Sequence, residues 1–339
     1  SVFKAIGKIA DKRGERVFVI GGFVRDLILD RRSKDIDIVT EGKGIDLAKD
    51  VAKELGIRKV NVFKNFGTAM FNRDDLEVEF VGARKESYKR GSRKPIVEDG
   101  TLEDDQNRRD FTINAMALSL NSENYGELVD PFNGMRDIDL GVIRTPLDPD
   151  ITYNDDPLRM MRAVRFATQL GFTIVPESID ALKRNATRLE IISMERIHIE
   201  LNKIILAKRP GQGFKILAKT GLLKQFFPEM VDLQGVETRN GIGHKDNFLH
   251  TLQVLENVSD KSDDLWLRWA AILHDIAKPP TKRFDNRNGW TFHGHEDKGA
   301  RMTPQIFKRL KLPMDAKMKF VQKLVLLHLR PIALTKEVV

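Results

Sequence analysis

The sequence contains no cysteine and no apolar run close to the roughly 20 residues that a membrane-spanning helix needs. Without cysteine the chain can form neither disulfides nor thiolate metal sites, which fits a reducing, cytoplasmic setting. Its 339 residues exceed what one ordinary hydrophobic core serves, so we expect two or three domains. A formal net charge of +8 favours a polyanionic partner, nucleic acid first.

The hydrophobic pattern changes along the chain and predicts an α+β protein. Residues 1–150 mix buried strands with helices and indicate an α/β head, in which the polar stretch 84–107 is expected to be a loop. Beyond that point the strands stop: residues 151–238 indicate an all-α neck, with one helix running from Asp155 to Gly171. Residues 239–339 indicate an all-α tail that holds most of the histidines.

Asp35 and Asp37 stand two residues apart in a predicted strand, so their side chains share one face while Ile36 and Ile38 point into the core. Two adjacent carboxylates repel each other, and a divalent cation removes that cost. Carboxylate oxygens suit Mg²⁺, which keeps room for substrate phosphates. A third ligand is expected at Glu79, although Glu77 shares its face and the pattern does not choose between them. Taken alone, such a pair is more often a solvated strand edge.

The context of this carboxylate pair favours the metal site. Gly21 and Gly22 end the preceding strand and open a helix, where backbone N–H groups can approach a triphosphate. Arg25 lies just inside that helix, within reach of phosphate oxygens. A strand, a Gly-Gly turn, a helix and a carboxylate strand are the layout of a nucleotidyl-transfer palm.

Five segments in this order resemble the motifs of the class II tRNA nucleotidyltransferase and bacterial poly(A) polymerase family. They are GGFVRD (21–26) with DIDIV (35–39), RRDFTINA (108–115), DPFNGMRDI (130–138), DDPLRMMRAVRFATQLGF (155–172) and SMERIHIEL (193–201). The resemblance covers most of residues 17–230. It implies a palm-like head that binds metal and triphosphate, followed by a helical region that reads the incoming base.

The resemblance also implies roles for single residues. Asp35 and Asp37 would bind two Mg²⁺ ions, with Glu79 as a third carboxylate. The nucleotide would be held by Gly21, Gly22, Arg25, Arg109, Asp110 and Asn114. Asp156 and Arg159 would hydrogen-bond the base, with Arg162 and Arg165 beside them towards the phosphates. The family's usual Glu-Asp is Asp155-Asp156 here, which puts only the supporting role of Asp155 in question.

The chemistry of the proposed base-reading pair agrees with these roles. On a helix, Asp156 and Arg159 would be neighbours, three residues apart. The aspartate accepts from an exocyclic amine and the arginine donates to a ring nitrogen and a carbonyl, so the pair would accept CTP and ATP and disfavour UTP and GTP. Without the other motifs, an ordinary surface ion pair would be the better interpretation.

The polar stretch 84–107 bears on which member of the family this is. It resembles the flexible loop that CCA-adding enzymes need to switch from CTP to ATP, and no long basic tail of the poly(A) polymerase type follows. We therefore predict addition of CCA to the tRNA 3′ end. Poly(A) addition, and A-only or CC-only addition, remain the alternatives within the family.

The histidines of the tail resemble an HD-type metal phosphohydrolase domain. His250, His274, Asp275 and His295 are the expected ligands of a divalent transition metal, ahead of His293 and His328. The further aspartate of that pattern has no good candidate before Val339, so the tail is expected to be truncated. The fold can also keep its histidines as core polar groups and use the tail only to grip RNA.

Two alternatives come from other functional classes. A metal phosphohydrolase whose head only senses nucleotides is disfavoured by the intact head residues. A non-catalytic RNA-binding protein would explain the charge but not the paired carboxylates.

Overall fold

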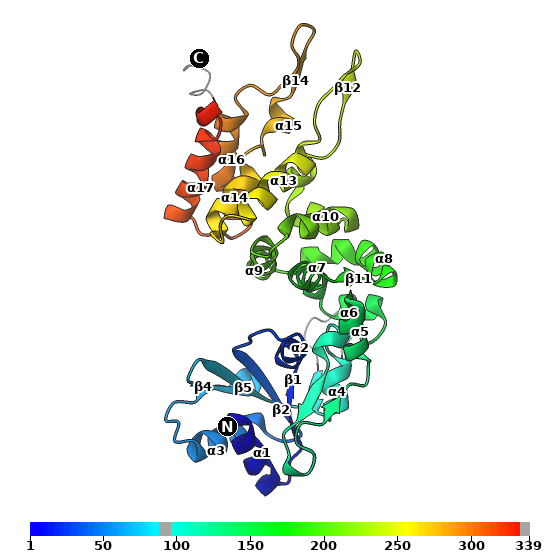
Figure 1. The fold of residues 1–339 in the computed structure, drawn as a ribbon, viewed down its shortest axis with the longest axis vertical. Coiled ribbons are helices and arrows are strands. Elements are labelled where there is room, and N and C mark those ends of the chain that lie inside the picture. Colours follow the sequence, from blue (N-terminus) through cyan, green and yellow to red (C-terminus); the bar gives the residue numbers. More distant parts are fainter. Residues whose placement is uncertain (88–95, 333–339) are drawn as a thin grey trace. The chain divides into compact units, whose positions relative to one another are not determined.

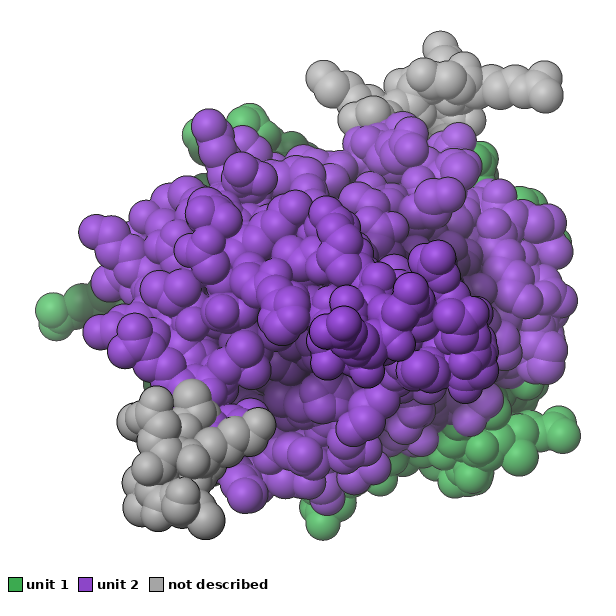
Figure 2. Space-filling model, turned by 90° about the horizontal axis from the view of Figure 1, so that it is seen from above, with its two compact units in different colours: residues 1–155 green, residues 156–339 purple. Residues whose placement is uncertain are grey.

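The computed structural model describes residues 1–87 and 96–332, and the chain divides into two compact units (Figures 1 and 2). Unit 1 comprises Ser1–Asp155 and unit 2 comprises Asp156–Val339. Among the described residues, no helix is both long enough and apolar enough to cross a bilayer.

A seven-stranded sheet in the order β3-β4-β5-β2-β1-β8-β9 forms the centre of unit 1. Neighbouring strands are antiparallel except for β2 and β5, which are parallel. The four residues of β1 are all buried, as expected for an apolar strand in mid-sheet. The strands are β1 (Val17–Ile20), β2 (Asp35–Thr40), β3 (Asn61–Phe63), β4 (Thr68–Arg73), β5 (Leu76–Gly82), β8 (Ala117–Ser119) and β9 (Leu128–Val129).

Helices flank this sheet, and their ends follow from local sequence. The predicted strand, Gly-Gly turn and helix are confirmed, because α2 begins at Gly22 directly after β1. In α3, Leu47 and Val51 are buried and Gly56 follows the helix with φ of 69°. The helices of unit 1 are α1 (Val2–Arg13), α2 (Gly22–Ile28), α3 (Gly44–Glu54), α4 (Leu102–Asn107), α5 (Gly134–Leu140) and α6 (Pro149–Asp155).

Unit 2 is built mainly from helices, with α9 packed against both α7 and α14. Arg268 of α14 is buried and donates hydrogen bonds to the carbonyls of Ile205 and Ala207 at the end of α9. Trp269 Nε1 donates to Asn202 Oδ1 of the same helix. The helices are α7 (Leu158–Leu170), α8 (Pro176–Asn185), α9 (Met194–Ile205), α10 (Pro210–Thr220), α11 (Leu222–Phe226), α12 (Pro228–Val231), α13 (Asn247–Ser259), α14 (Leu265–Leu273), α15 (Lys278–Thr281), α16 (His295–Arg309) and α17 (Ala316–Leu327).

The predicted loop over residues 84–107 is wrong for most of its length. Strand β6 (Arg84–Ser87) pairs with β7 (Ile96–Asp99), so the backbone groups of two short extended runs satisfy each other. Helix α4 then begins at a capping box, in which Thr101 and Asp104 exchange hydrogen bonds with each other's backbone N–H groups. Residues 88–95 of the predicted loop lie outside the described residues.

Two predictions about the second half also need correction. Strands do continue after residue 150: β12 (Thr238–Arg239) pairs with β13 (Ile242–Gly243), and β14 (Arg283–Asp285) with β15 (Gly289–Thr291). Each pair is a hairpin around a short turn with a glycine at positive φ, Gly241 in the first turn and Gly289 directly after the second, at the start of β15. The helix predicted from Asp155 instead begins at Leu158, because Pro157 disfavours helical backbone in the residue before it.

Candidate active site

The paired carboxylates share one face of a strand, as predicted, and lie near the start of β2, the middle strand of the sheet, at the edge where that strand begins. Ile36 and Ile38 are buried, whereas Asp35 is exposed and Asp37 is half-buried. The parallel register of β2 and β5 places Asp35 beside Glu77 and Asp37 beside Glu79. Glu79 is half-buried, and burial together with the nearby charge of Asp37 raises the pKa of its carboxyl. Burial is the larger cause, and the repulsion from Asp37 adds to it; a bound cation would relieve that repulsion.

The oxygens of these carboxylates are not gathered tightly around one point. Among the described residues, the oxygens of Asp35, Asp37 and Glu79 are not a group whose ligand atoms all lie within 4.8 Å of one another. Mg²⁺ usually binds through one or two carboxylates and leaves its other positions to water and phosphates. A ligand set made only of carboxylate oxygens therefore fits Mg²⁺ with a nucleoside triphosphate.

Gly21 brings the glycine turn and a basic side chain up to this edge. Its backbone has φ of 82° and ψ of −136°, a conformation that residues with a Cβ rarely adopt. A Cβ at this position would lie 2.9 Å from Arg109 Nη1 and 3.6 Å from Asp37 Oδ2. Arg109 and Asp37, 72 positions apart in the sequence, thus face the same small space beside the turn.

The remaining predicted nucleotide-binding residues of unit 1 form one hydrogen-bonded chain. Arg25 is buried, and its Nη1 donates to Asn114 Oδ1 at 2.7 Å while its Nε donates to Asp26 Oδ1. Asn114 Nδ2 in turn donates to Asp110 Oδ1 at 3.2 Å. The structure therefore brings Arg25, Asn114 and Asp110 together, with the guanidinium held in a fixed orientation.

Asp105 is a positioning residue that the sequence analysis missed. It is fully buried, and its two oxygens accept hydrogen bonds from Arg108 and Arg109, the latter at 3.1 and 3.0 Å from Nε and Nη2. Burial alone would raise the pKa of Asp105, but the charges of Arg109 and Arg108 outweigh it and lower that pKa. The signal was the spacing of the three residues, at i, i+3 and i+4 across the end of α4, whose last residue is Asn107.

The predicted base-reading residues lie at the start of unit 2. Asp156 precedes α7 rather than lying on it: its Oδ1 accepts from the backbone N–H of Leu158, and its carbonyl from the N–H of Arg159. Its other carboxylate oxygen lies 3.4 Å from Nη2 of Arg196 on α9. Asp156 is therefore not on the helix as predicted, but the hydrogen bond from the Arg159 N–H to its carbonyl keeps Asp156 and Arg159 in one turn of chain.

Arg162 and Arg165 follow along α7. Both guanidinium groups lie over the ring of Phe166, at 5.2 Å for Arg162 and 4.2 Å for Arg165. Arg165 is buried and its Nε lies 2.8 Å from Glu200 Oε2 on α9. Sequence reasoning did not find Arg196 and Glu200 as partners, although both lie within the segment SMERIHIEL and are spaced i, i+4.

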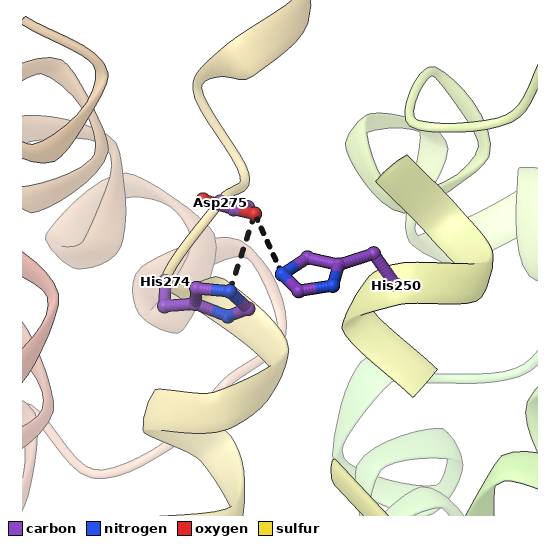
Figure 3. A group of neighbouring side chains, drawn as sticks. All are labelled: His250, His274 and Asp275. Atoms are coloured by element: carbon purple, nitrogen blue, oxygen red, sulfur yellow. Dashed lines mark ion pairs between the residues drawn. The ribbon is translucent and has the colours of Figure 1, made fainter. Parts of the chain in front are cut away.

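A second site lies wholly within unit 2, around the carboxylate of Asp275 (Figure 3). Its Oδ2 lies 3.2 Å from His274 Nε2 and 3.6 Å from His250 Nε2, and its Oδ1 lies 3.3 Å from His295 Nε2. The predicted ligands His250, His274, Asp275 and His295 are therefore brought together. His293 is exposed and outside this cluster, whereas His328 joins it, 3.7 Å from Asp275 Oδ1.

The donor set of this histidine cluster fits a divalent transition metal. His250, His274 and Asp275, and likewise Asp275, His295 and His328, each offer ligand atoms within 4.8 Å of one another. Burial lowers the pKa values of His250 and His328, which keeps both imidazoles neutral and able to ligate. Burial opposes ionisation of Asp275, but hydrogen bonds from His274 and His295 outweigh it and hold its pKa well below its usual range.

The histidine cluster opens into a cavity of about 670 Å³ with mostly apolar walls, among them Val254, Leu324 and Ile332. Lys278, which the sequence analysis did not single out, also lines it, and its Nζ lies 2.8 Å from Asp275 Oδ2. An ammonium group at the cluster supplies a positive charge for an anionic ligand.

Comparison with known proteins assigns the parts of the chain. Three family models match: "Poly A polymerase head domain" over residues 17–144, "Probable RNA and SrmB- binding site of polymerase A" over 171–233, and "HD domain" over 247–338. The multifunctional CCA protein of Nitrosococcus oceani is 34% identical over 306 residues, which cover 88% of this chain and 70% of that protein. The chain belongs to the class II tRNA nucleotidyltransferase and poly(A) polymerase family.

Other members of this family extend the comparison. The A-adding tRNA nucleotidyltransferase of Aquifex aeolicus is 42% identical over 202 residues, 60% of this chain but only 24% of that protein. A solved structure titled "Structure of tRNA-processing enzyme with CTP" has a TM-score of 0.71 at 27% identity and covers 98% of this chain and 80% of its own. The predicted fold, a palm-like head followed by helical regions ending in an HD domain, is confirmed.

Proposed function

We propose that this protein adds CMP and AMP to the 3′ end of tRNA, building CCA from CTP and ATP without a template, in the cytoplasm. The observation that carries this proposal is the edge where Asp35, Asp37 and Glu79 lie beside the Gly21 turn and Arg109. The family relatives support it, since their names include CCA addition and A addition to tRNA and one solved relative is described with CTP. We propose the same three-part division, 1–150, 151–238 and 239–339.

The residues of unit 1 supply the transfer chemistry. Asp35, Asp37 and Glu79 would hold Mg²⁺, which when bound favours deprotonation of the attacking 3′-hydroxyl and neutralises charge on the leaving pyrophosphate. Gly21 and Gly22 carry no side chain of their own, so their backbone would be open to the triphosphate, with the guanidinium groups of Arg109 and Arg25 beside them. Arg109, fixed by Asp105, presents its guanidinium to the same space and would orient a phosphate or ribose oxygen.

The residues of unit 2 select the base. Asp156 accepts from the exocyclic amine that cytosine and adenine share, and Arg159 donates to the ring nitrogen or carbonyl next to it. Arg196 and Glu200 of α9 lie against Asp156 and Arg165 and so hold this segment in place. Asp156 and Arg159 would therefore select the base in the addition of CMP and again in the addition of AMP.

The test is to incubate the protein with Mg²⁺, a tRNA that lacks its CCA end, and each nucleotide singly and together. We expect addition of C, then C, then A, resolved on a sequencing gel. Addition of a single A to a tRNA ending in CC, with no incorporation of C, would place the chain with its A-adding relatives instead. Unlimited adenylation of any RNA would make it a poly(A) polymerase.

We further propose that the histidine cluster around Asp275 binds a divalent transition metal. Metal analysis of the purified protein should find about one equivalent that is lost in His274→Ala, a residue 13% exposed that contacts Asp275 directly. The matched control is His293→Ala, which removes an exposed histidine outside the cluster. Equal metal content in the wild type and His274→Ala would contradict the assignment.

A further inference from the structure

Two hairpins of unit 2 project beside each other from the region of α13 and α15 (Figure 1). The first is β12–β13 and the second is β14–β15, and the two touch through β13 and β15. Trp290 Nε1 of the second hairpin donates a hydrogen bond to the carbonyl of Ile242 in the first, at 3.0 Å. The side chain of Ile242 also lies against Gly289, where a Cβ would be 3.2 Å from it. We call these paired hairpins, residues 236–245 and 282–291, the hairpin ridge.

Trp290 sits at the centre of an aromatic cluster that ties the hairpin ridge together. Its ring lies edge-on to those of His244, at 5.3 Å, and Phe284, at 5.1 Å. The ammonium of Lys282 lies 5.2 Å from the Trp290 ring, and the guanidinium of Arg239 lies 4.9 Å from the Phe284 ring. These contacts give a small projecting element a defined shape although little of it is buried.

The acidic groups near the hairpin ridge are engaged in local structure. Glu237 pairs with Lys282 at 2.5 Å. Asp285 accepts the backbone N–H groups of Arg287 and Asn288 in its own turn. Asp246, just beyond the ridge, accepts from Leu249 at the start of α13 and from Gly235.

Unlike these acidic groups, four basic side chains of the hairpin ridge have no partner of opposite charge among the described residues. Arg239, Lys245, Arg283 and Arg287 are all exposed. Within the described part of the chain, none of the four has a carboxylate oxygen within 4.0 Å. Four cations without a carboxylate partner in that part of the chain form a positive surface on this projection; Arg283 Nη1 bonds a backbone carbonyl, that of Lys282, and Arg239 lies over the Phe284 ring, so their charges stay available.

We propose that the hairpin ridge binds the phosphate backbone of the substrate RNA, through Lys245, Arg283 and Arg287 and with Arg239 beside them. Charge complementarity favours a polyanion, and the excess of cations agrees with the net charge of +8. Phosphate contacts of this kind fix the position of an RNA without reading its sequence. The inference rests on the proposed function for the identity of the RNA, and it assigns a contact surface outside both candidate sites.

The test compares two triple variants of the full chain for binding to a tRNA that lacks its CCA end. Lys245→Ala, Arg283→Ala and Arg287→Ala together should weaken binding about tenfold at moderate salt and reduce the slope of log Kd against log salt by about 2 to 3. The KM for RNA should rise and kcat at saturating RNA should stay unchanged. The matched control removes three exposed lysines of α16 and α17, Lys308, Lys319 and Lys323, and should bind RNA nearly as the wild type does.

Each outcome separates this inference from the proposed function. If the wild type binds tRNA through the ridge but adds no nucleotide, the proposed function fails and the ridge assignment stands. If the wild type adds nucleotides and the ridge variant, folded by circular dichroism, binds RNA with unchanged affinity and salt slope, the ridge assignment is overturned. An equal loss of affinity in the ridge and control variants would also overturn it, since the effect would then be one of net charge alone.

Discussion

Replacing Asp35 with alanine is expected to abolish nucleotide addition, with a loss of at least about a thousandfold in kcat. A metal ion stabilises the charge of a phosphoryl-transfer transition state by several kcal/mol, and each 1.36 kcal/mol corresponds to about a factor of ten in rate. Asp35 is exposed at the end of β2, so its loss leaves the buried face of that strand, including Ile36 and Ile38, intact. Single-turnover addition of CMP to tRNA measures the effect.

The neighbouring strand provides the control for this prediction. Glu77 and Glu79 lie on the same face of β5, but Glu79 is the one beside Asp37, and Glu77 is exposed. We expect Glu79→Ala to impair addition strongly and Glu77→Ala to leave it within about a factor of two or three. The denaturation midpoint of Asp35→Ala should match that of the wild type. Near-normal activity in Asp35→Ala, with the wild type active, would remove the metal-site assignment.

The alternation of residues within one strand was enough to predict that Asp35 and Asp37 share a face. It was not enough to predict which glutamate of the neighbouring strand joins them. Period two puts Asp35 and Asp37 on one side of a strand, and the structure confirms that Ile36 and Ile38 fill the other. The same period puts Glu77 and Glu79 on one face, so it cannot separate them. That choice depends on the parallel register between β2 and β5, which pairs residues about 42 positions apart and leaves no trace in either strand's own sequence.

Ion pairs between different elements of the fold also could not be predicted from the sequence. Arg165 pairs with Glu200, and Asp156 lies near Arg196, through the packing of α7 on α9. A helix pattern shows which residues share a face, but not which face of another helix it meets. Asp105 with Arg108 and Arg109 differs, because the three residues are close in sequence around the end of α4, and their spacing alone could have indicated the contact.

Two predicted elements were misplaced, the helix from Asp155 and the loop over residues 84–107. A proline explains the first and backbone pairing explains the second. Pro157 separates α6 from α7, so Asp156 became a residue that precedes a helix rather than one on its surface. The stretch 84–107 is polar, and polarity suggested a loop. Residues 84–87 and 96–99 within it nevertheless pair as β6 and β7, because a two-stranded hairpin needs few apolar side chains when its backbone groups bond each other.

Asp156→Asn is expected to reduce discrimination against UTP and GTP by about tenfold to a hundredfold. A carboxylate only accepts hydrogen bonds, whereas an amide both accepts and donates, so a carbonyl in place of the exocyclic amine would be tolerated. A correctly placed pair of hydrogen bonds to a base is worth about 1–3 kcal/mol of discrimination, by analogy with base readout in DNA. The measurement is the ratio of kcat/KM for CTP to that for UTP, and for ATP to GTP, on the same tRNA.

This substitution is chosen because it changes the donor pattern and little else. The oxygen that asparagine retains can still accept the N–H of Leu158, so the start of α7 should be preserved. Asp180→Asn makes the same chemical change at a position that is 61% exposed and pairs with Lys183 on its own helix, and it should leave both ratios unchanged. If Asp156→Asn keeps the wild-type ratios while its activity falls, the residue acts through the contact with Arg196 rather than by reading the base.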